Sequence, residues 1–440
     1  MNVGLLTLLL FGSLVFLLAL GLPLAFAMGG VAVIGIYFVM GPQSIPIIYF
    51  NVIAPFKDIT YVSIPLFIFM AYMLERAGIA ENLYTTIQYW AGRIKGSLAM
   101  GTVIISTILA AMVGLSSASI ITMGVTVMPA MIKRGYDRNL AMGAIAAGST
   151  LGILIPPSAL GALYAMAAGV SVGRMFLAGF LPGFLIAGIF ILYIGIRCYL
   201  NPKLGPAMPP EERVSQRKKL VSLSSVILPS LLVVGVLGSI FLGIATVTES
   251  AAVGALGSIL VVFINRKFTW KNFKEVNYNT MLLTLMIMWM MVAAGSFRAL
   301  YVVTHAGDLI QEAFMVVPGG KWGAIIASQL ILLIMGLCMD EFEILIIALP
   351  IFVPVMRAFG VDLLWWGVMF VINMEVAEIS PPLGLNLFCM KAVVGDGVPM
   401  EQIWRAVMPF VALLILAIII IMVFPPIATY LPEAIITRGR

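Results

Sequence analysis

The sequence predicts an all-α polytopic membrane protein, built as an inverted repeat with five crossings and one re-entrant hairpin in each half. Three observations predict this fold class. Of the 440 residues, 62% are hydrophobic and 10% are charged, whereas soluble domains carry about 25% charged residues. Apolar segments of roughly 20 residues recur along the chain, and a helix of that length crosses about 30 Å of hydrocarbon. Finally, landmarks of the first half recur in order in the second half.

Ten apolar runs are predicted to cross the membrane. The first lies in "MNVGLLTLLLFGSLVFLLALGLPLAFAMGG", which lacks a basic leading region and is too long for the apolar part of a signal peptide. We therefore expect it to be retained as the first helix. The runs are centred near residues 12, 32, 68, 155, 186, 231, 255, 288, 378 and 413.

Two further apolar stretches, 97–132 and 322–356, have polar interruptions halfway, in "GLSSASI" and "CMDEFEI". Each is either a pair of crossings or one re-entrant hairpin, and the predicted fold takes the hairpin. Both alternatives return the chain to the side it came from, so positive charge fixes the orientation without deciding between them. Of the 25 Lys and Arg residues, 18 fall on one side, which the positive-inside rule makes cytoplasmic.

This orientation places both termini outside and the basic linker 201–219 in the cytoplasm. The net charge of +6 is explained by the same distribution, so no nucleic-acid partner is predicted.

The repeat has a spacing of 225 residues. The pattern "PxM…GxD" and a proline pair recur in one register across 29 residues, which chance does not readily produce. We expect a first repeat over 1–200 and a second over 220–440, each with three helices, a hairpin, a broken helix and a closing helix. Five crossings per half would invert the second copy, as in secondary transporters. The matched pairs are Pro129 and Pro354, Met131 and Met356, Gly135 and Gly360, Asp137 and Asp362, and Pro156-Pro157 and Pro381-Pro382.

The proline pairs break helices inside apolar runs, because proline lacks the backbone donor and clashes with the preceding turn. Such breaks, predicted around 156–157 and 381–382, free backbone carbonyls that can hold a cation such as Na⁺. They also expose half-helix amino ends, which favour anions.

Hydroxyl groups gather at the predicted tip and break of the first half. They are candidates for a cation or substrate site, although small residues also serve simply to pack helices together. The group comprises Ser116, Ser117, Ser119, Ser149, Thr150 and Ser158.

Acidic and amide side chains occupy the corresponding places in the second half. Carboxylates at bilayer depth cost at least about 2.5 kcal/mol each and are treated as functional, unless the hairpin is shallow and they are solvated. We expect Glu341 and Glu343 to be partly solvated and Asp340 to be the better candidate. Glu375 and Glu378 either bind a proton or cation or form a structural pair. The group also contains Asn373, Ser380 and Asn386, and a separate Glu249 either caps its helix or takes part in transport.

The sequence contains no motif typical of ATP hydrolysis, metal binding or redox chemistry. The chain has no Walker-type phosphate loop, and its three cysteines lack metal or redox spacing, so no transition metal is predicted. An intramembrane protease would not require the repeat, and a passive channel would not require a coupling ion.

The sequence resembles the large membrane subunit of tripartite ATP-independent periplasmic (TRAP) transporters over essentially the whole chain. The motifs are "GIATVTESAAVGAL", "GLSSAS", "GSTLGILIPPS", "PVMRAFGVD" and "SPPLGLNLF". The resemblance implies an elevator-type secondary transporter of the bacterial inner membrane, in which Na⁺ drives uptake of a small organic acid. It also implies two partners, a periplasmic substrate-binding protein and a small four-helix membrane subunit. A stand-alone Na⁺/dicarboxylate symporter of the same architecture is the alternative.

The resemblance also implies site residues. The Na⁺ ligands would be Ser116, Ser117, Asp340 and the segments containing Gly152, Ile155, Pro156, Ser380, Pro381 and Pro382. The substrate would lie near Ser119, Ser149, Thr150, Ser158, Glu378 and Asn386. Glu375 and Glu378 depart from the family, whose corresponding stretch is mostly neutral, and would repel a dicarboxylate unless one is protonated.

Overall fold

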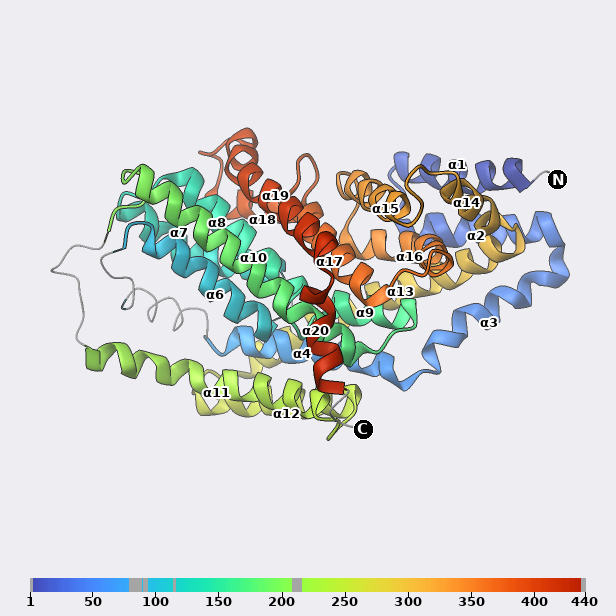
Figure 1. Ribbon diagram of the computed structural model, residues 1–440. Helices are drawn as coiled ribbons and strands as arrows, with labels where there is room; N and C mark the ends of the chain where they lie inside the picture. Colours follow the sequence, from blue (N-terminus) through green and yellow to red (C-terminus); the bar gives the residue numbers. More distant parts are fainter. Residues whose placement is uncertain (1–2, 79–88, 90–93, 114–115, 208–215, 437–440) are drawn as a thin grey trace.

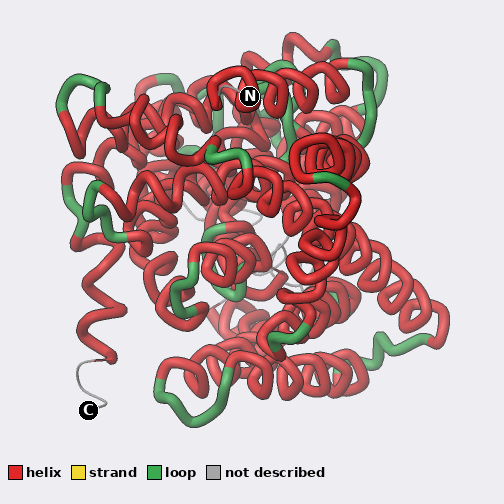
Figure 2. Tube along the Cα trace, turned by 90° about the vertical axis from the view of Figure 1, so that its right-hand side faces the viewer, coloured by secondary structure: helices red, strands yellow, loops and turns green. Residues whose placement is uncertain are grey.

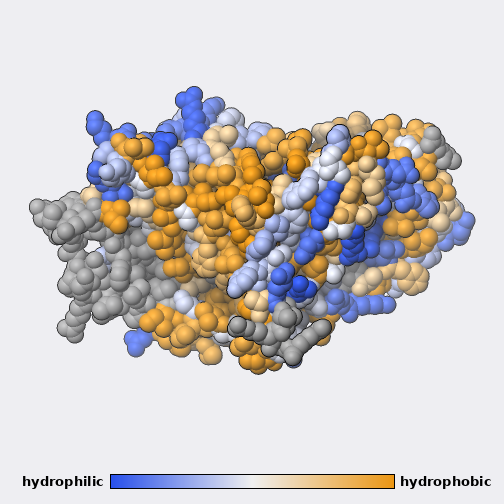
Figure 3. Space-filling model, in the orientation of Figure 1, coloured by the Kyte–Doolittle hydropathy of each residue, from blue (hydrophilic) through white to orange (hydrophobic). Residues whose placement is uncertain are grey.

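The computed structural model describes residues 3–78, 89, 94–113, 116–207 and 216–436 (Figure 1). Within these ranges every regular element is a helix (Figure 2). Hydrophobic residues cover much of the face shown in Figure 3, as expected of a surface that meets lipid. The predicted class, an all-α polytopic membrane protein, is confirmed.

One set of helices, here called the first group, packs around the 34-residue helix α13 (Trp270–Val303). Helix α13 contacts α2, α3 and α4, and α12 contacts both α4 and α11. The other members are α1 (Val3–Ala19), α2 (Leu24–Met40), α3 (Ile45–Phe56), α4 (Ser63–Arg76), α11 (Gln216–Phe241) and α12 (Val247–Ile264), with short 3₁₀ turns η1 (Pro42–Ser44) and η2 (Ile59–Val62).

The remaining helices, the second group, surround α17 (Leu363–Ile379). Every residue from Leu364 to Ile379 is buried, because α8, α9, α10, α15 and α19 all contact this helix. Its members from the first half are α6 (Ser97–Val113), α7 (Ser116–Lys133), α8 (Arg138–Thr150), η3 (Leu151–Ile153), α9 (Ala159–Ala168) and α10 (Val172–Leu200). Those from the second half are α14 (Ala306–Met315), α15 (Gly320–Gly336), α16 (Glu341–Ala358), α18 (Leu385–Val394), α19 (Met400–Val423) and α20 (Pro426–Ile436).

Among the described residues, five helical segments are long and apolar enough to span a membrane, and no more than 56% of the apolar part of any of them is buried inside the protein. They are Ile59–Arg76, Val172–Leu200, Val247–Ile264, Trp270–Val303 and Met400–Val423. A sixth results if α14 and α15, which meet at a bend of 118°, are counted together. Helices α1 and α2 have 17 residues each. The number of crossings and the inversion of the second half stay predictions.

The repeated "GxD" pattern has a local structural cause. Gly135 and Gly360 follow α7 and α16 with φ of 75° and 61°, a left-handed conformation that ends helices and that glycine adopts without strain. Two residues later, Asp137 accepts a hydrogen bond from Leu140 N at 2.9 Å and Asp362 from Leu364 N at 2.7 Å. These carboxylates cap α8 and α17, so each copy of the pattern ends one helix and starts the next.

Both capped helices stop at the proline pairs. Helix α8 ends at Thr150 and α9 begins at Ala159, while α17 ends at Ile379 and α18 begins at Leu385. The peptide bond within each proline pair is cis. Helices α8 and α17 are buried almost throughout. The first break is also buried, whereas in the second break Pro381 is half-buried and Pro382 and Leu383 are exposed.

A hydrogen bond joins the two halves at the start of α17. Tyr164 of α9 donates its hydroxyl hydrogen to Leu363 O at 2.6 Å, and its ring packs against Trp366 and Phe370 of α17. The bond and the ring contacts fix α9 against the central helix.

Candidate functional site at the helix breaks

A small pocket, here called the inner chamber, lies where residues beside the two helix breaks meet the beginnings of α7 and α16. Its volume is about 120 Å³, which holds only a few water-sized groups. Its polar lining comes from both halves of the chain and consists of Tyr72, Ser116, Ser117, Asp340, Glu341 and Glu378.

Three side chains from three helices meet beside the inner chamber, and two of them, Ser116 and Glu378, line it. Ser116, at the start of α7, donates a hydrogen bond to Glu378 Oε1 in the last turn of α17. Asn386 of α18 donates from Nδ2 to Glu378 Oε2 at 3.1 Å. All three side chains are at least 95% buried, so their polar atoms rely on one another in place of water.

The opposite wall is the beginning of α16. Asp340 caps this helix and accepts a hydrogen bond from Phe342 N at 3.4 Å, while Glu343 Oε2 accepts from Asp340 N at 3.5 Å. Glu341 is 7% exposed, which corrects the expectation that it is partly solvated; Glu343 is half-buried, as expected. The start of α16 shares the chamber with Glu378 of α17, and α16 also contacts α9 and α17, so tertiary packing removes Glu341 from water.

Four helices begin at the chamber, since residues of the first turns of α7, α9, α16 and α18 line it. A helix amino end carries roughly half a positive charge. These ends partly offset the carboxylates of Asp340, which is half-buried, and of Glu341 and Glu378, which are buried. No Lys, Arg or His occurs among the described lining residues, so the balancing charge must come from protons or from a bound cation.

The chamber suits a small hard cation. Hydroxyl and carboxylate oxygens are the ligands such cations prefer, and Ser116, Ser117 and Asp340 all line it. The other predicted Na⁺ ligands are not among its lining residues: Gly152, Ile155, Pro156 and Ser380 are buried, Pro381 is half-buried and Pro382 is exposed. Ile153 of the first break contributes to the lining.

The predicted substrate residues separate into two sets. Glu378 and Asn386 belong to the network described above, and Ser119 lies one turn after Ser116 with a buried hydroxyl that has no partner among the described atoms. Ser149 and Thr150 donate to Ile145 O and Ala147 O of their own helix, and Ser158 caps α9 by accepting from Gly161 N at 3.0 Å. Of the six predicted substrate residues, only Glu378 lines the inner chamber.

Two acids remain outside the chamber. Both carboxylate oxygens of Glu375 are buried without a partner in the described part of the chain. Glu249 forms a reciprocal capping box with Thr246 at the start of α12, which is the capping alternative left open by the sequence.

Sequence reasoning did not single out Tyr72 or Phe342 as lining residues. Tyr72 carries no local motif, and Phe342 is apolar and lies within an acidic run. Their positions follow from tertiary packing.

Helices that stop inside an apolar bundle and surround a polar chamber define a polytopic membrane transport protein, because broken backbone is tolerated at that depth only beside protein or a cavity. The family model described as "Tripartite ATP-independent periplasmic transporter, DctM component" matches residues 11–427. The chain therefore belongs to this family, whose members are permease subunits of the inner membrane and not enzymes. Membership implies partnership with a periplasmic binding protein and a membrane subunit.

Named relatives cover nearly the full length. The C4-dicarboxylate TRAP transporter large permease protein DctM of Pseudomonas aeruginosa is 32% identical over 89% of this chain and 90% of its own. The ectoine TRAP transporter large permease protein TeaC of Halomonas elongata is 25% identical, over 97% of this chain and 99% of its own. The sialic acid TRAP transporter large permease protein SiaM of Vibrio cholerae is 27% identical, over 87% and 88%.

Two solved structures share the fold. The YdaH transporter of Alcanivorax borkumensis aligns with a TM-score of 0.63 at 15% identity, covering 89% of this chain and 91% of its own. MtrF of Neisseria gonorrhoeae aligns with a TM-score of 0.61 at 16% identity, covering 87% and 84%.

Proposed function

We propose that this chain is the permease of a Na⁺-coupled importer that receives a small organic acid from a periplasmic binding protein and works with a small four-helix membrane subunit. The observation that carries the proposal is the inner chamber, where Ser116, Glu378 and Asn386 converge among oxygen ligands. Relatives named for C4-dicarboxylates and for sialic acid support an acid as substrate.

Sodium would bind between Ser116, Ser117 and Asp340, with backbone oxygens from the two proline breaks completing its shell. A cation there would balance the buried carboxylates, so its arrival would reduce the repulsion of an anionic substrate. Binding of Na⁺ and binding of the acid would therefore be coupled, because each charge lowers the electrostatic cost of burying the other.

The substrate would bind beside the same network, near Ser119, Glu378 and Asn386. The unpartnered hydroxyl of Ser119 supports this placement, since a buried polar group without a partner is costly. Ser149, Thr150 and Ser158 would stabilise the first break, whose backbone faces the same region.

Transport would proceed by an elevator movement of the second group against the first. The first group contributes Tyr72, Leu283 and Met286 to the chamber, a mainly apolar surface. The proposal also keeps the charge-based orientation, with both termini in the periplasm.

Uptake into proteoliposomes tests the proposal, with labelled succinate and sialic acid as probes and the membrane subunit and binding protein supplied. We expect uptake of one probe that requires both an inward Na⁺ gradient and the binding protein. Uptake without the binding protein would instead identify a stand-alone symporter, and uptake without a gradient would identify a channel.

A further inference from the structure

A second, larger cavity, here called the outer cavity, has a volume of about 620 Å³. Its walls are α3 and η2, α9, α13 and α16, so it lies between the two groups of helices. Cavities of roughly 300–1,000 Å³ typically hold small organic ligands, whereas the inner chamber is several times smaller.

The two cavities follow one another along the same helices. On α13, Leu283 and Met286 line the inner chamber, whereas Ile287 to Val302 contribute to the outer cavity. Phe342, at the start of α16, lines both. Because Phe342 lines both cavities, we infer that its side chain lies between them.

Positive charge marks the far end of the outer cavity. Arg298 lies 12 residues beyond Met286 on α13, which is about 18 Å along a helix, and Arg357 lies 15 residues beyond Phe342, about 22 Å along α16. Both guanidinium groups line the outer cavity, and Asp58 is the one acid among its described lining residues. The carboxylate of Asp58 accepts a hydrogen bond from Thr60 N at 2.9 Å.

The two arginines differ in their contacts. Arg357 donates from Nη2 to Ala168 O at 2.7 Å, which anchors its planar group at the end of α9 and leaves its other N–H groups available. Arg298 makes no hydrogen bond or ion pair within the described chain, and Arg is suited to bidentate binding of carboxylates.

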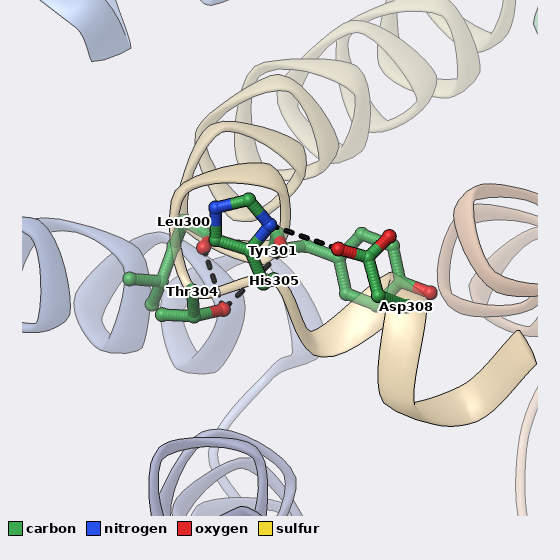
Figure 4. A network of polar contacts seen from close by, with 5 residues as sticks. All are labelled: Leu300, Tyr301, Thr304, His305 and Asp308. Atoms are coloured by element: carbon green, nitrogen blue, oxygen red, sulfur yellow. Dashed lines mark hydrogen bonds and ion pairs between the residues drawn. The ribbon is translucent and has the colours of Figure 1, made fainter. Parts of the chain in front are cut away.

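The neighbouring acid on α14 is engaged elsewhere. Asp308 Oδ2 lies 2.8 Å from His305 Nδ1 (Figure 4), just beyond the point where Thr304 closes α13 by donating to Leu300 O at 2.9 Å. Neither His305 nor Asp308 lines the outer cavity, so Asp308 does not neutralise Arg298 there.

Between the arginines and Phe342 the wall is apolar. Leu345, Ile346, Leu349 and Val353 of α16 recur at helical spacing along it. A ligand with an anionic group at one end and a carbon skeleton at the other would match this arrangement.

We propose that the outer cavity is a second binding site, in which Arg298 and Arg357 hold the carboxylate of a small organic acid before it passes Phe342. The proposal rests on the proposed function for the identity of the ligand. The preference of the outer cavity for anions follows from the two arginines alone, so it can be tested without measuring transport.

The rate at which a cysteine reacts with charged reagents measures that selectivity. Ala294 lines the outer cavity one helical turn before Arg298, so Ala294→Cys is introduced into a chain whose more accessible thiols are removed by Cys338→Ala and Cys389→Ala. The purified protein is treated with an anionic and a cationic methanethiosulfonate. We expect the anionic reagent to be favoured, and Arg298→Gln to lower its preference about fivefold through the loss of a nearby cation.

Lys321→Gln is the matched control, because Lys321 bonds to Gly360 O and lines neither cavity. Succinate should slow the anionic reagent in the parent chain and in this control, but not after Arg298→Gln. An equal reagent preference in Arg298→Gln and Lys321→Gln would overturn the site. Arg298→Gln tests the site without disturbing the contact that Arg357 makes with α9.

Measurements of uptake distinguish a failure of the arginine site from a failure of the proposed importer function. With the site as proposed, Arg298→Gln raises the KM for the transported acid about fivefold and leaves the maximal rate and the Na⁺ dependence unchanged. Absence of uptake in the parent chain together with retained anion preference would reject the importer and support the site. Normal uptake without anion preference would reject the site alone.

Discussion

Ser116 and Glu378 are 262 positions apart in the sequence and share a hydrogen bond inside the inner chamber. One residue begins a hairpin helix of the first half, and the other ends the broken helix of the second half. The bond therefore makes both halves of the chain necessary for one site.

Ser116→Ala should weaken Na⁺ activation of uptake. The change removes a proposed ligand and one of the two side chains that satisfy Glu378, whose unpaired oxygen would cost about 1–3 kcal/mol. We expect the Na⁺ concentration for half-maximal uptake to rise about tenfold, which corresponds to about 1.4 kcal/mol. Ser106→Ala, at a buried hydroxyl outside the chamber, should leave this concentration unchanged; a similar rise in both variants would indicate a general packing effect.

Asp340→Asn should separate the capping role of this residue from its proposed role in Na⁺ binding. Asn caps helices about as well as Asp, so the thermal midpoint should change little. Loss of the negative charge should raise the half-saturating Na⁺ concentration about tenfold, because a shift of about 1.4 kcal/mol is tenfold in affinity. Glu343→Gln, which keeps the capping partner in place, is the control, and unchanged Na⁺ dependence in Asp340→Asn would remove this residue from the site.

The paired caps Asp137 and Asp362 should contribute comparably to stability. Replacing either by Ala removes the hydrogen bond that starts α8 or α17 and should lower the free energy of unfolding by about 1 kcal/mol. Thermal unfolding in detergent measures this against Asp396→Ala, whose fully exposed side chain lies 3.8 Å from Lys391. Equal midpoints for the cap and control variants would contradict the account of the repeated motif.

Two glycine substitutions should act in opposite directions. A Cβ at Gly367 would lie 2.2 Å from the ring of Tyr164, which is held by its bond to Leu363 O. Gly367→Ala should therefore destabilise the protein by about 1–3 kcal/mol through overpacking. A Cβ at Gly188 in α10 would meet nothing within 4 Å, so Gly188→Ala should stabilise by up to about 1 kcal/mol; a stabilising Gly367→Ala would refute the close contact between α9 and α17.

Sequence reasoning went furthest where the signal was local. Proline pairs interrupt helices by their own covalent structure. Asp137 and Asp362 were recognised from the sequence as matched positions of the repeat, and the structure adds that both cap helices. Ser116 and Asp340 could also be recognised from the sequence as candidate site residues, because hydroxyl and carboxylate groups stand out in an apolar chain.

Tertiary packing determined the rest. The burial of Glu341 depends on how the tip of the second hairpin meets α17, and no local pattern distinguishes it from the half-buried Glu343. Ser149 and Thr150 stand beside a break, yet their hydroxyls bond to their own helix. Arg298 and Arg357 served only as indicators of topology in the sequence, because they are 59 positions apart and only the fold brings both to one cavity.

The most direct test of the central claim is the thermal unfolding midpoint of the purified protein in NaCl and in choline chloride at equal ionic strength. A cation held by the native chamber stabilises the folded state by mass action, so the account predicts a higher midpoint in NaCl. The difference should be lost in the Ser116→Ala, Asp340→Asn double variant. Equal midpoints in the two salts for the unmodified protein, or an undiminished difference in the double variant, would contradict it.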